Sequence, residues 1–196
     1  MKNNVYIFIG QSGSGKGTQV SLLQKKVQTL DPSIQTYHLE TGDTFRKLIS
    51  ENGYTAKRTK ELLDEGVLPP AFLGIHAWSH LLIENYDGAQ YVFIDGTPRV
   101  AVEVPALLSA FEFYDWHPHV FYIQVGDEWA YDRLVNRGRP DDKDSHDVWN
   151  RIQWFHESVI PAIELLKASD RVEFHLIHGE QTIEAVHQDI CAALDI

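Results

Sequence analysis

Short apolar runs recur along the chain and alternate with longer stretches in which apolar residues return every three or four positions. Compact apolar runs are typical of strands buried on both faces of a sheet, and the longer period is typical of amphipathic helices. Five runs are predicted to be strands, over 5–9, 34–39, 91–94, 119–125 and 172–177. Because strands and helices alternate, we expect an α/β three-layer sandwich with a five-stranded parallel sheet. Ligands bind such sheets at the carboxyl ends of the strands.

Helical periodicity fills the segments between these runs and predicts helices over 18–27, 56–65, 70–84 and 128–137. The helix over 70–84 is expected to have Pro70 at its first helical position, where the missing N–H of proline costs no hydrogen bond. The longest helix should carry its apolar stripe at Val148, Ile152, Phe155, Val159, Ile163 and Leu166. Pro161 removes a hydrogen bond from that helix and is expected to kink it.

Composition places the chain among ordinary globular proteins, with 196 residues, 43% hydrophobic and 23% charged. We expect one domain over 1–196. The formal net charge of −11 argues against a nucleic-acid polymer as partner, so any bound anion needs a local cluster of cations. The single cysteine, Cys191, excludes a disulfide and a Cys-based zinc site. With neither a signal peptide nor a run of ~20 apolar residues, the expected location is the cytoplasm, away from membranes.

A glycine-rich turn, Gly10 to Thr18, joins the first predicted strand to the first helix. Strand, turn and helix in this order are the context that the phosphate-binding pattern G-x-x-x-x-G-K requires. Glycines let successive N–H groups point inward as an anion nest, and the helix N-terminus adds partial positive charge. Lys16 supplies a full charge for the outer phosphates. An ordinary glycine loop is the alternative, but it accounts for neither the lysine nor the flanking elements. The turn therefore predicts a nucleoside triphosphate site.

The residue after Lys16 narrows the class of nucleotide-binding protein that the turn indicates. GTPases and motor ATPases usually have Ser or Thr there as an Mg²⁺ ligand, whereas this chain has Gly17 followed by Thr18. The form Gly-x-x-Gly-x-Gly-Lys-Gly-Thr resembles the nucleoside monophosphate kinases, and adenylate kinases most closely. The resemblance implies a monomeric phosphate-loop kinase that uses ATP and Mg²⁺ to phosphorylate a nucleoside monophosphate. It also implies a mobile monophosphate-binding flap, 43–86, and a short lid, 138–147.

A second motif, running from Thr41 to Arg46, follows the second predicted strand. Thr41 and Gly42 should end that strand, and Asp43 should cap the next helix. By themselves these residues allow Arg46 to be a solvated helix residue. The stretch resembles the family's Thr-Gly-Asp-x-x-Arg segment, which implies that Thr41 lies near the base and that Arg46 grips the monophosphate. Thr41 matches the adenylate type rather than the alanine of UMP/CMP kinases, so AMP is the expected acceptor.

A third motif, Asp95-Gly96-Thr97-Pro98-Arg99, ends the third predicted strand. An unpaired acidic residue at the tip of a buried strand is costly, and a nearby Mg²⁺ with its water shell would make that position favourable. We therefore expect Mg²⁺ near Asp95 through water, without a direct protein ligand. The motif resembles the family's Asp-Gly-(aromatic)-Pro-Arg, which implies that Gly96 and Arg99 contact the monophosphate. Thr97 departs from the pattern by replacing the aromatic ring.

Glu103 stands four residues beyond Arg99, where adenylate kinases usually carry a glutamine that reads the base. An ionised Glu only accepts hydrogen bonds. It could therefore pair with the exocyclic amino group of adenine or cytosine, or with the N–H groups of guanine, and it would disfavour uracil and thymine. A solvent-facing helix residue is the alternative.

Three arginines converge within seven residues, at Arg133, Arg137 and Arg139. The first two are four residues apart on a predicted helix, without an acidic residue three or four positions earlier to offset their repulsion. A bound anion explains this cluster better than a solvated helix face. The resemblance implies that Arg133 stacks on the ATP adenine and that Arg137, Arg139 and, further along, Arg151 clamp the phosphates.

These assignments together define three groups of site residues. The expected ATP site comprises Gly13, Ser14, Gly15, Lys16, Gly17, Thr18, Arg133 and, in the segment that opens the last helix, Gln181. The expected monophosphate site comprises Thr41, Arg46, Pro69, Gly96, Arg99 and Glu103. The expected catalytic groups are Lys16, Asp95, Arg137, Arg139 and Arg151.

A kinase for another monophosphate, CMP, GMP or a dNMP, is the first alternative, and two functions of other classes also remain open on the residues alone. A kinase for a small metabolite alcohol would need a general base and has no use for the Arg46/Arg99 pair. A non-catalytic nucleotide-binding protein would be expected to lose some of the cations. His76 and His80 stand four residues apart and could hold a metal, but they are interpreted as surface or packed histidines. His117 and His119, two residues apart, are likewise interpreted as surface or packed histidines.

Overall fold

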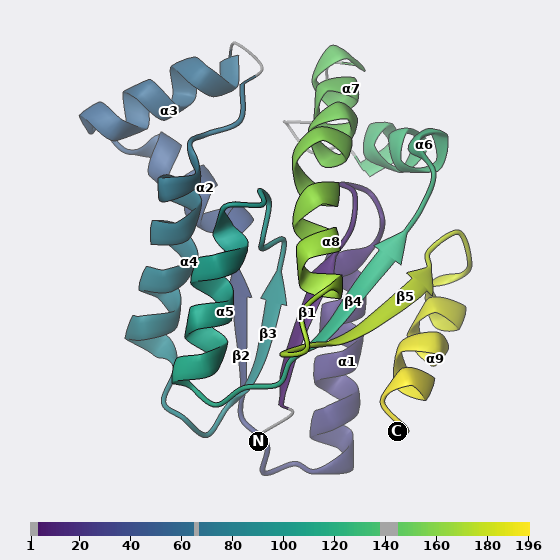
Figure 1. Ribbon diagram of the computed structural model, residues 1–196. Helices are drawn as coiled ribbons and strands as arrows, with labels where there is room; N and C mark the ends of the chain where they lie inside the picture. Colours follow the sequence, from purple (N-terminus) through teal and green to yellow (C-terminus); the bar gives the residue numbers. More distant parts are fainter. Residues whose placement is uncertain (1–3, 65–66, 138–144) are drawn as a thin grey trace.

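The structure is a computed structural model that describes residues 4–64, 67–137 and 145–196. Five parallel strands form one sheet in the order β2-β3-β1-β4-β5 (Figure 1). Their bounds are β1 Val5–Ile9, β2 Thr36–Glu40, β3 Tyr91–Asp95, β4 His119–Gln124 and β5 Glu173–His178. All five predicted strands are confirmed to within two residues at each end. The central strand β1 is buried along its whole length, as expected for a strand covered on both faces.

Helices cover both faces of the sheet, which confirms the predicted three-layer α/β sandwich (Figure 1). The helices are α1 Lys16–Leu30, α2 Thr41–Ser50, α3 Tyr54–Asp64, α4 Ala71–Asn85, α5 Glu103–Phe113, α6 Asp127–Arg137, α7 Ser145–Trp154, α8 Ile160–Lys167 and α9 Ile183–Ala193. One apolar core joins the sheet to α1 and α9, with Leu23 and Ile190 among its buried residues. A second core joins the opposite face to α4, α5 and α8, with Trp78, Phe111 and Ile163 buried.

The predicted long helix is divided by a π-helical turn, Phe155–Val159, between α7 and α8. Within this turn the N–H of Ile160 donates to the carbonyl of Phe155, five residues earlier. Pro161 follows at the second position of α8, so the irregularity lies just before the proline that predicted it. The predicted stripe packs inward, with Val159 half-buried and the other five residues buried. Single π-turns of this kind are common at functional sites.

Two predictions about helix starts are wrong, by three residues for α2 and by one for α4. Helix α2 begins at Thr41, directly after β2, and Glu40 is its N-cap residue. Position 43 therefore lies within the first turn rather than at the N-cap. Pro70 is the N-cap residue of α4 rather than its first helical residue. No helix in the described ranges is long and apolar enough to cross a membrane.

Candidate nucleotide-binding site

A cavity of about 1780 Å³ opens at the carboxyl ends of the strands, bordered by the glycine turn, the tip of β3, α2, α6 and α7. Pockets for a single small ligand usually measure about 300–1,000 Å³, so this one is large enough for two nucleotides. Among the described residues, six cationic and four acidic side chains line it. The positive balance is local, because the whole chain has a formal charge of −11. Such a balance favours anionic ligands.

The glycine turn has the backbone that its sequence predicts. It lies between β1 and α1, and Gly13 and Gly15 adopt left-handed conformations with φ of 87° and 94°. A Cβ on Gly10 would lie 2.5 Å from the carbonyl oxygen of Ile123 in β4, so only glycine allows the turn to pack this closely against the sheet. Helix α1 begins at Lys16, so the turn leads into a helix N-terminus. This arrangement is suited to holding phosphate groups.

Lys16 reaches back along the turn that precedes it. Its Nζ donates to the carbonyl oxygens of Gly10 and Gln11, each 2.8 Å away. Burial lowers the pKa of Lys16, the Asp95 carboxylate opposes that shift, and the Arg99 and Arg137 guanidinium groups add to it. A buried ammonium group surrounded by other cations is stabilised when an anion binds beside it. The surroundings of Lys16 therefore favour a bound anion such as phosphate.

Asp95 ends β3 beside the glycine turn and lines the cavity. A Cβ on Gly17 would lie 3.4 Å from Asp95 Oδ2, so the carboxylate stands within contact distance of the first turn of α1. Oxygen donors of this kind suit Mg²⁺, which keeps several of its waters when it binds next to phosphates. The donor chemistry at this point fits the hydrated Mg²⁺ that the sequence predicts.

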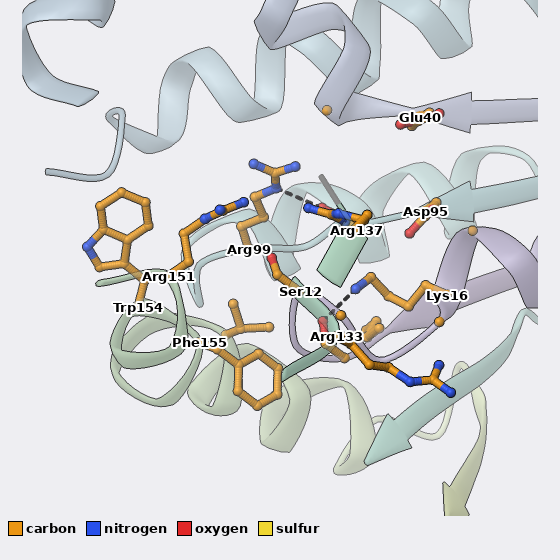
Figure 2. Close-up of a pocket in the computed structure, with 18 of the residues that line it drawn as sticks. Ser12, Lys16, Glu40, Asp95, Arg99, Arg133, Arg137, Arg151, Trp154 and Phe155 are labelled. Atoms are coloured by element: carbon orange, nitrogen blue, oxygen red, sulfur yellow. Dashed lines mark hydrogen bonds between the residues drawn. The ribbon is translucent and has the colours of Figure 1, made fainter. Parts of the chain in front are cut away.

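Three guanidinium groups from three different elements reach toward one space above the glycine turn (Figure 2). Arg99 comes from the loop after β3, Arg137 from the last turn of α6 and Arg151 from the last turn of α7. Arg99 Nε donates to the carbonyl of Gly96 at 3.1 Å, and its Cζ lies 5.8 Å from the centroid of the Phe45 ring. Like charges that gather in one cavity repel each other unless anions separate them. The convergence is the arrangement expected for binding phosphate groups.

Arg133 lies on the other side of the glycine turn from these three arginines (Figure 2). Its Cζ is 4.9 Å from the centroid of the Trp129 ring, one helical turn earlier in α6. Gln181 lies in the loop before α9 rather than in the helix, because α9 begins at Ile183. Together with Gly15 and Thr18, Arg133 and Gln181 line a second, small hollow next to the main cavity. The structure thus brings these two predicted ATP-site residues together beside the glycine turn.

Some of the predicted monophosphate residues border the opposite part of the cavity. Pro69, Gly96 and Arg99 line it. Thr41 does not, because its hydroxyl is buried and donates to the Gly96 carbonyl at 3.3 Å. The Thr97 hydroxyl in turn donates to the Thr41 oxygen at 3.3 Å. Thr41 and Thr97 therefore fix the ends of β2 and β3 against each other, and the adjacent Gly42 is the residue that lines the cavity.

Glu103 is not the solvent-facing residue that the sequence left open, because only 3% of its surface is exposed. Its carboxylate lies behind α4, where a Cβ on Gly74 would be 2.9 Å from Oε1. Burial raises the pKa of Glu103, while backbone hydrogen bonds and the guanidinium of Arg99 lower it. It is not among the residues that line the main cavity.

Two predicted phosphate ligands cannot be placed. The side chain of Arg46 and the whole of Arg139 lie outside the part of the chain that the structure describes, as does most of the predicted lid, 138–147.

Sequence reasoning missed several aromatic residues that border the site. Phe45 and Trp129 line the cavity and contact Arg99 and Arg133 respectively. Trp129 could have been found, because it precedes Arg133 by four residues on a predicted helix and so shares its face. Trp154 and Phe155 also line the cavity, at the start of the π-helical turn (Figure 2). No local pattern indicates them, since the turn itself places them there.

Comparison with known proteins gives a consistent result. The model of the adenylate kinase family matches residues 8–171. The chain is 29% identical over 195 residues to an adenylate kinase of Trichodesmium erythraeum, covering 96% of each chain. It is 30% identical to one from Prochlorococcus marinus, covering 92% of each, and 29% identical to one from Phocaeicola vulgatus, covering 98% of each. The similarity therefore spans all the elements that border the cavity.

Proposed function

The chain belongs to the adenylate kinase family and is a nucleoside monophosphate kinase, and we propose that Mg·ATP is its donor and AMP its preferred acceptor. The observation that carries the proposal is the convergence of Lys16, Arg99, Arg137 and Arg151 on one cavity with room for two nucleotides. A site for ATP alone would need cations on one side of the transferred group only.

The donor is proposed to bind along the glycine turn. Backbone N–H groups of residues 13–18 would hold the β-phosphate, and Lys16 would turn from its carbonyl partners to the outer phosphates. Arg133 and Gln181 would border the adenine. Asp95 would hold Mg²⁺ through water, and the ion would neutralise charge on the phosphates.

The acceptor is proposed to bind on the Arg99 side of the cavity. Arg99 and Arg46 would hold its phosphate, and Gly96 and Pro69 would border the nucleoside. Arginine suits this task because its planar guanidinium binds a phosphate through two parallel hydrogen bonds. These contacts would aim an acceptor oxygen at the terminal phosphorus of ATP.

The chemistry then needs no protein nucleophile or general base. The acceptor phosphate is already anionic, so its oxygen forms a bond to the γ-phosphorus as the bond to the β-phosphate oxygen breaks. Catalysis consists of alignment and of stabilising charge on the transferred group. Lys16, Arg137, Arg139 and Arg151 are the residues proposed to surround that group. The products are ADP and a nucleoside diphosphate.

Water must be kept from the terminal phosphate, because it would otherwise accept the phosphoryl group. We therefore propose that the flap, 43–86, and the short lid, 138–147, close over the bound substrates. Residues of α2, within the flap, and of α6 and α7, which flank the lid, line the cavity, so movement of the flap and lid would cover it. As the family resemblance implies, we also propose a monomer, and we propose that it is located in the cytoplasm.

AMP is proposed as the acceptor on two grounds. Relatives that span nearly the whole chain are adenylate kinases, and Thr41 matches the adenylate-type motif. Glu103, four residues beyond Arg99, lies behind α4 and outside the cavity lining. Its proposed hydrogen bond from the exocyclic amino group of the base therefore requires α4, which is part of the flap, to move. UMP and dTMP have no such amino group, so they should be poor acceptors.

A panel of AMP, GMP, CMP, UMP and dNMPs with Mg·ATP tests this proposal by diphosphate formation. AMP is expected to give the highest kcat/KM, and UMP and dTMP the lowest. A preference for UMP would refute the role of Glu103. Inert monophosphates with an active alcohol acceptor would instead indicate a small-metabolite kinase, and ATP binding without any turnover would indicate a non-catalytic nucleotide-binding protein.

A further inference from the structure

Two histidines and a glutamate meet at the amino ends of β4 and β5, the edge of the sheet opposite the nucleotide cavity. His119 and Glu173 each begin a strand and are direct partners in the parallel register, and His175 follows two residues later. Because side chains alternate along a strand, Glu173 and His175 emerge on one face of β5. His119 lies on that same face of β4, next to them. Among the described residues, this is the cluster of His, Cys, Asp and Glu side chains whose ligand atoms converge closely enough for a metal ion.

The separations of the three ligand groups are close to those of a first coordination shell. His119 Nδ1 is 3.1 Å from His175 Nε2 and 3.4 Å from Glu173 Oε2. His175 Nε2 is 4.0 Å from Glu173 Oε1. Ligands at ~2.0–2.2 Å from a tetrahedral zinc ion lie ~3.3–3.6 Å apart. The two imidazole nitrogens have to separate slightly, and the Glu173 side chain, which is 47% exposed, is able to move to complete the shell.

Both imidazole rings are held in place by their neighbours. The His119 side chain is 11% exposed and stacks on Tyr6 with ring centroids 5.8 Å apart. The His175 side chain is 15% exposed and stacks on Phe121 at 5.0 Å. Because the rings are already positioned, little conformational entropy has to be lost when an ion binds.

The three polar atoms compete for one another, because His119 Nδ1 lies within reach of both His175 Nε2 and the Glu173 carboxylate. A single shared proton could join the two nitrogens, but it would leave the Glu173 carboxylate without a hydrogen-bond donor from this pair. One cation satisfies all three ligand atoms at once.

We propose that His119 Nδ1, His175 Nε2 and the Glu173 carboxylate form a binding site for a divalent transition-metal ion of the zinc class. Two nitrogen donors and one carboxylate favour zinc and its neighbours over Mg²⁺, which prefers oxygen ligands. The fourth position is left to water. The ion would join β5, an edge strand, to β4. Its role is stabilisation of the sheet, separate from phosphoryl transfer at the opposite edge.

The test is zinc titration of the metal-free, nucleotide-free full chain by calorimetry, with cobalt absorption spectra reporting nitrogen ligands. The wild type is expected to bind one ion per chain with micromolar or tighter affinity. Saturating zinc should raise Tm by about 5 °C or more. Glu173→Gln and His175→Gln should each weaken binding at least tenfold while kinase activity with AMP is kept.

The matched control is the double variant His76→Gln/His80→Gln. It removes an exposed histidine pair on α4 whose rings lie 5.6 Å apart, and it should bind zinc as tightly as the wild type. Zinc affinity unchanged in both Glu173→Gln and His175→Gln would overturn the proposal. So would loss of the ion in the control, or absence of binding to the wild type. Should His175→Gln fail to fold, the half-exposed Glu173→Gln still decides the question.

Discussion

Replacing Lys16 with methionine is expected to lower kcat for diphosphate formation by at least about 10³-fold. Methionine keeps the unbranched shape and most of the length of the side chain but removes the charge that would stabilise the transferring phosphoryl group. KM for AMP should change much less, because AMP is proposed to bind on the Arg99 side of the cavity. Steady-state kinetics with ATP and AMP varied separately would measure both parameters.

Two controls make the Lys16→Met result specific. Lys167→Met removes an exposed lysine at the end of α8 and should leave kcat unchanged. The Tm of Lys16→Met should stay within a few degrees of wild type, since the substitution removes a buried charge whose pKa is already lowered by burial. Near-normal turnover by folded Lys16→Met would mean that Lys16 has no part in phosphoryl transfer.

Replacing Arg137 with alanine is expected to lower kcat by about 10³-fold, the effect of removing a guanidinium aimed at a transferring phosphoryl group. Arg137 ends α6 close enough to influence the pKa of Lys16, and its guanidinium reaches toward those of Arg99 and Arg151 (Figure 2). Single-turnover measurements with ATP and AMP would show whether the chemical step is the one affected.

The comparison of Arg137→Lys with Arg137→Ala separates charge from geometry. Lysine keeps the positive charge but cannot bind phosphate with two parallel hydrogen bonds, so its kcat should fall between those of the wild type and Arg137→Ala. Arg58→Ala serves as the control, because Arg58 is exposed on α3 and paired there with Glu61 at 2.6 Å. Equal rates for wild type and Arg137→Ala would remove Arg137 from the site.

Much of the fold could be predicted because residues within each of these elements determine its backbone conformation. The glycine turn, with Lys16 after it, specifies its own backbone, and the compact apolar runs specify buried parallel strands. The start of α2 was predicted wrongly because Thr41 and Gly42 resemble the end of a strand. In the structure the helix begins directly after β2, without a side-chain cap that would have indicated it.

The features that sequence could not predict depend on pairs of distant segments. Glu103 is buried because α4 presents Gly74, a residue without a side chain, at the point of contact. His119 and His175 are 56 positions apart, and only the register between β4 and β5 brings them together. Periodicity indicates which face of an element is buried, but the partner of a particular side chain follows from strand order and register.

The central claim is that two phosphorylated molecules meet in one cavity and that each is held from a different side. Hydrogen exchange measures this most directly when three ligands are compared: a non-hydrolysable ATP analogue, AMP, and a bisubstrate analogue in which a chain of phosphates joins two adenosines. We expect the ATP analogue to slow exchange mainly in residues 10–20 and along α6, and AMP to slow it mainly in the flap, 43–86. The bisubstrate analogue should slow exchange in all of these segments and in the lid, 138–147. Protection confined to one side of the cavity with the bisubstrate analogue would contradict the account.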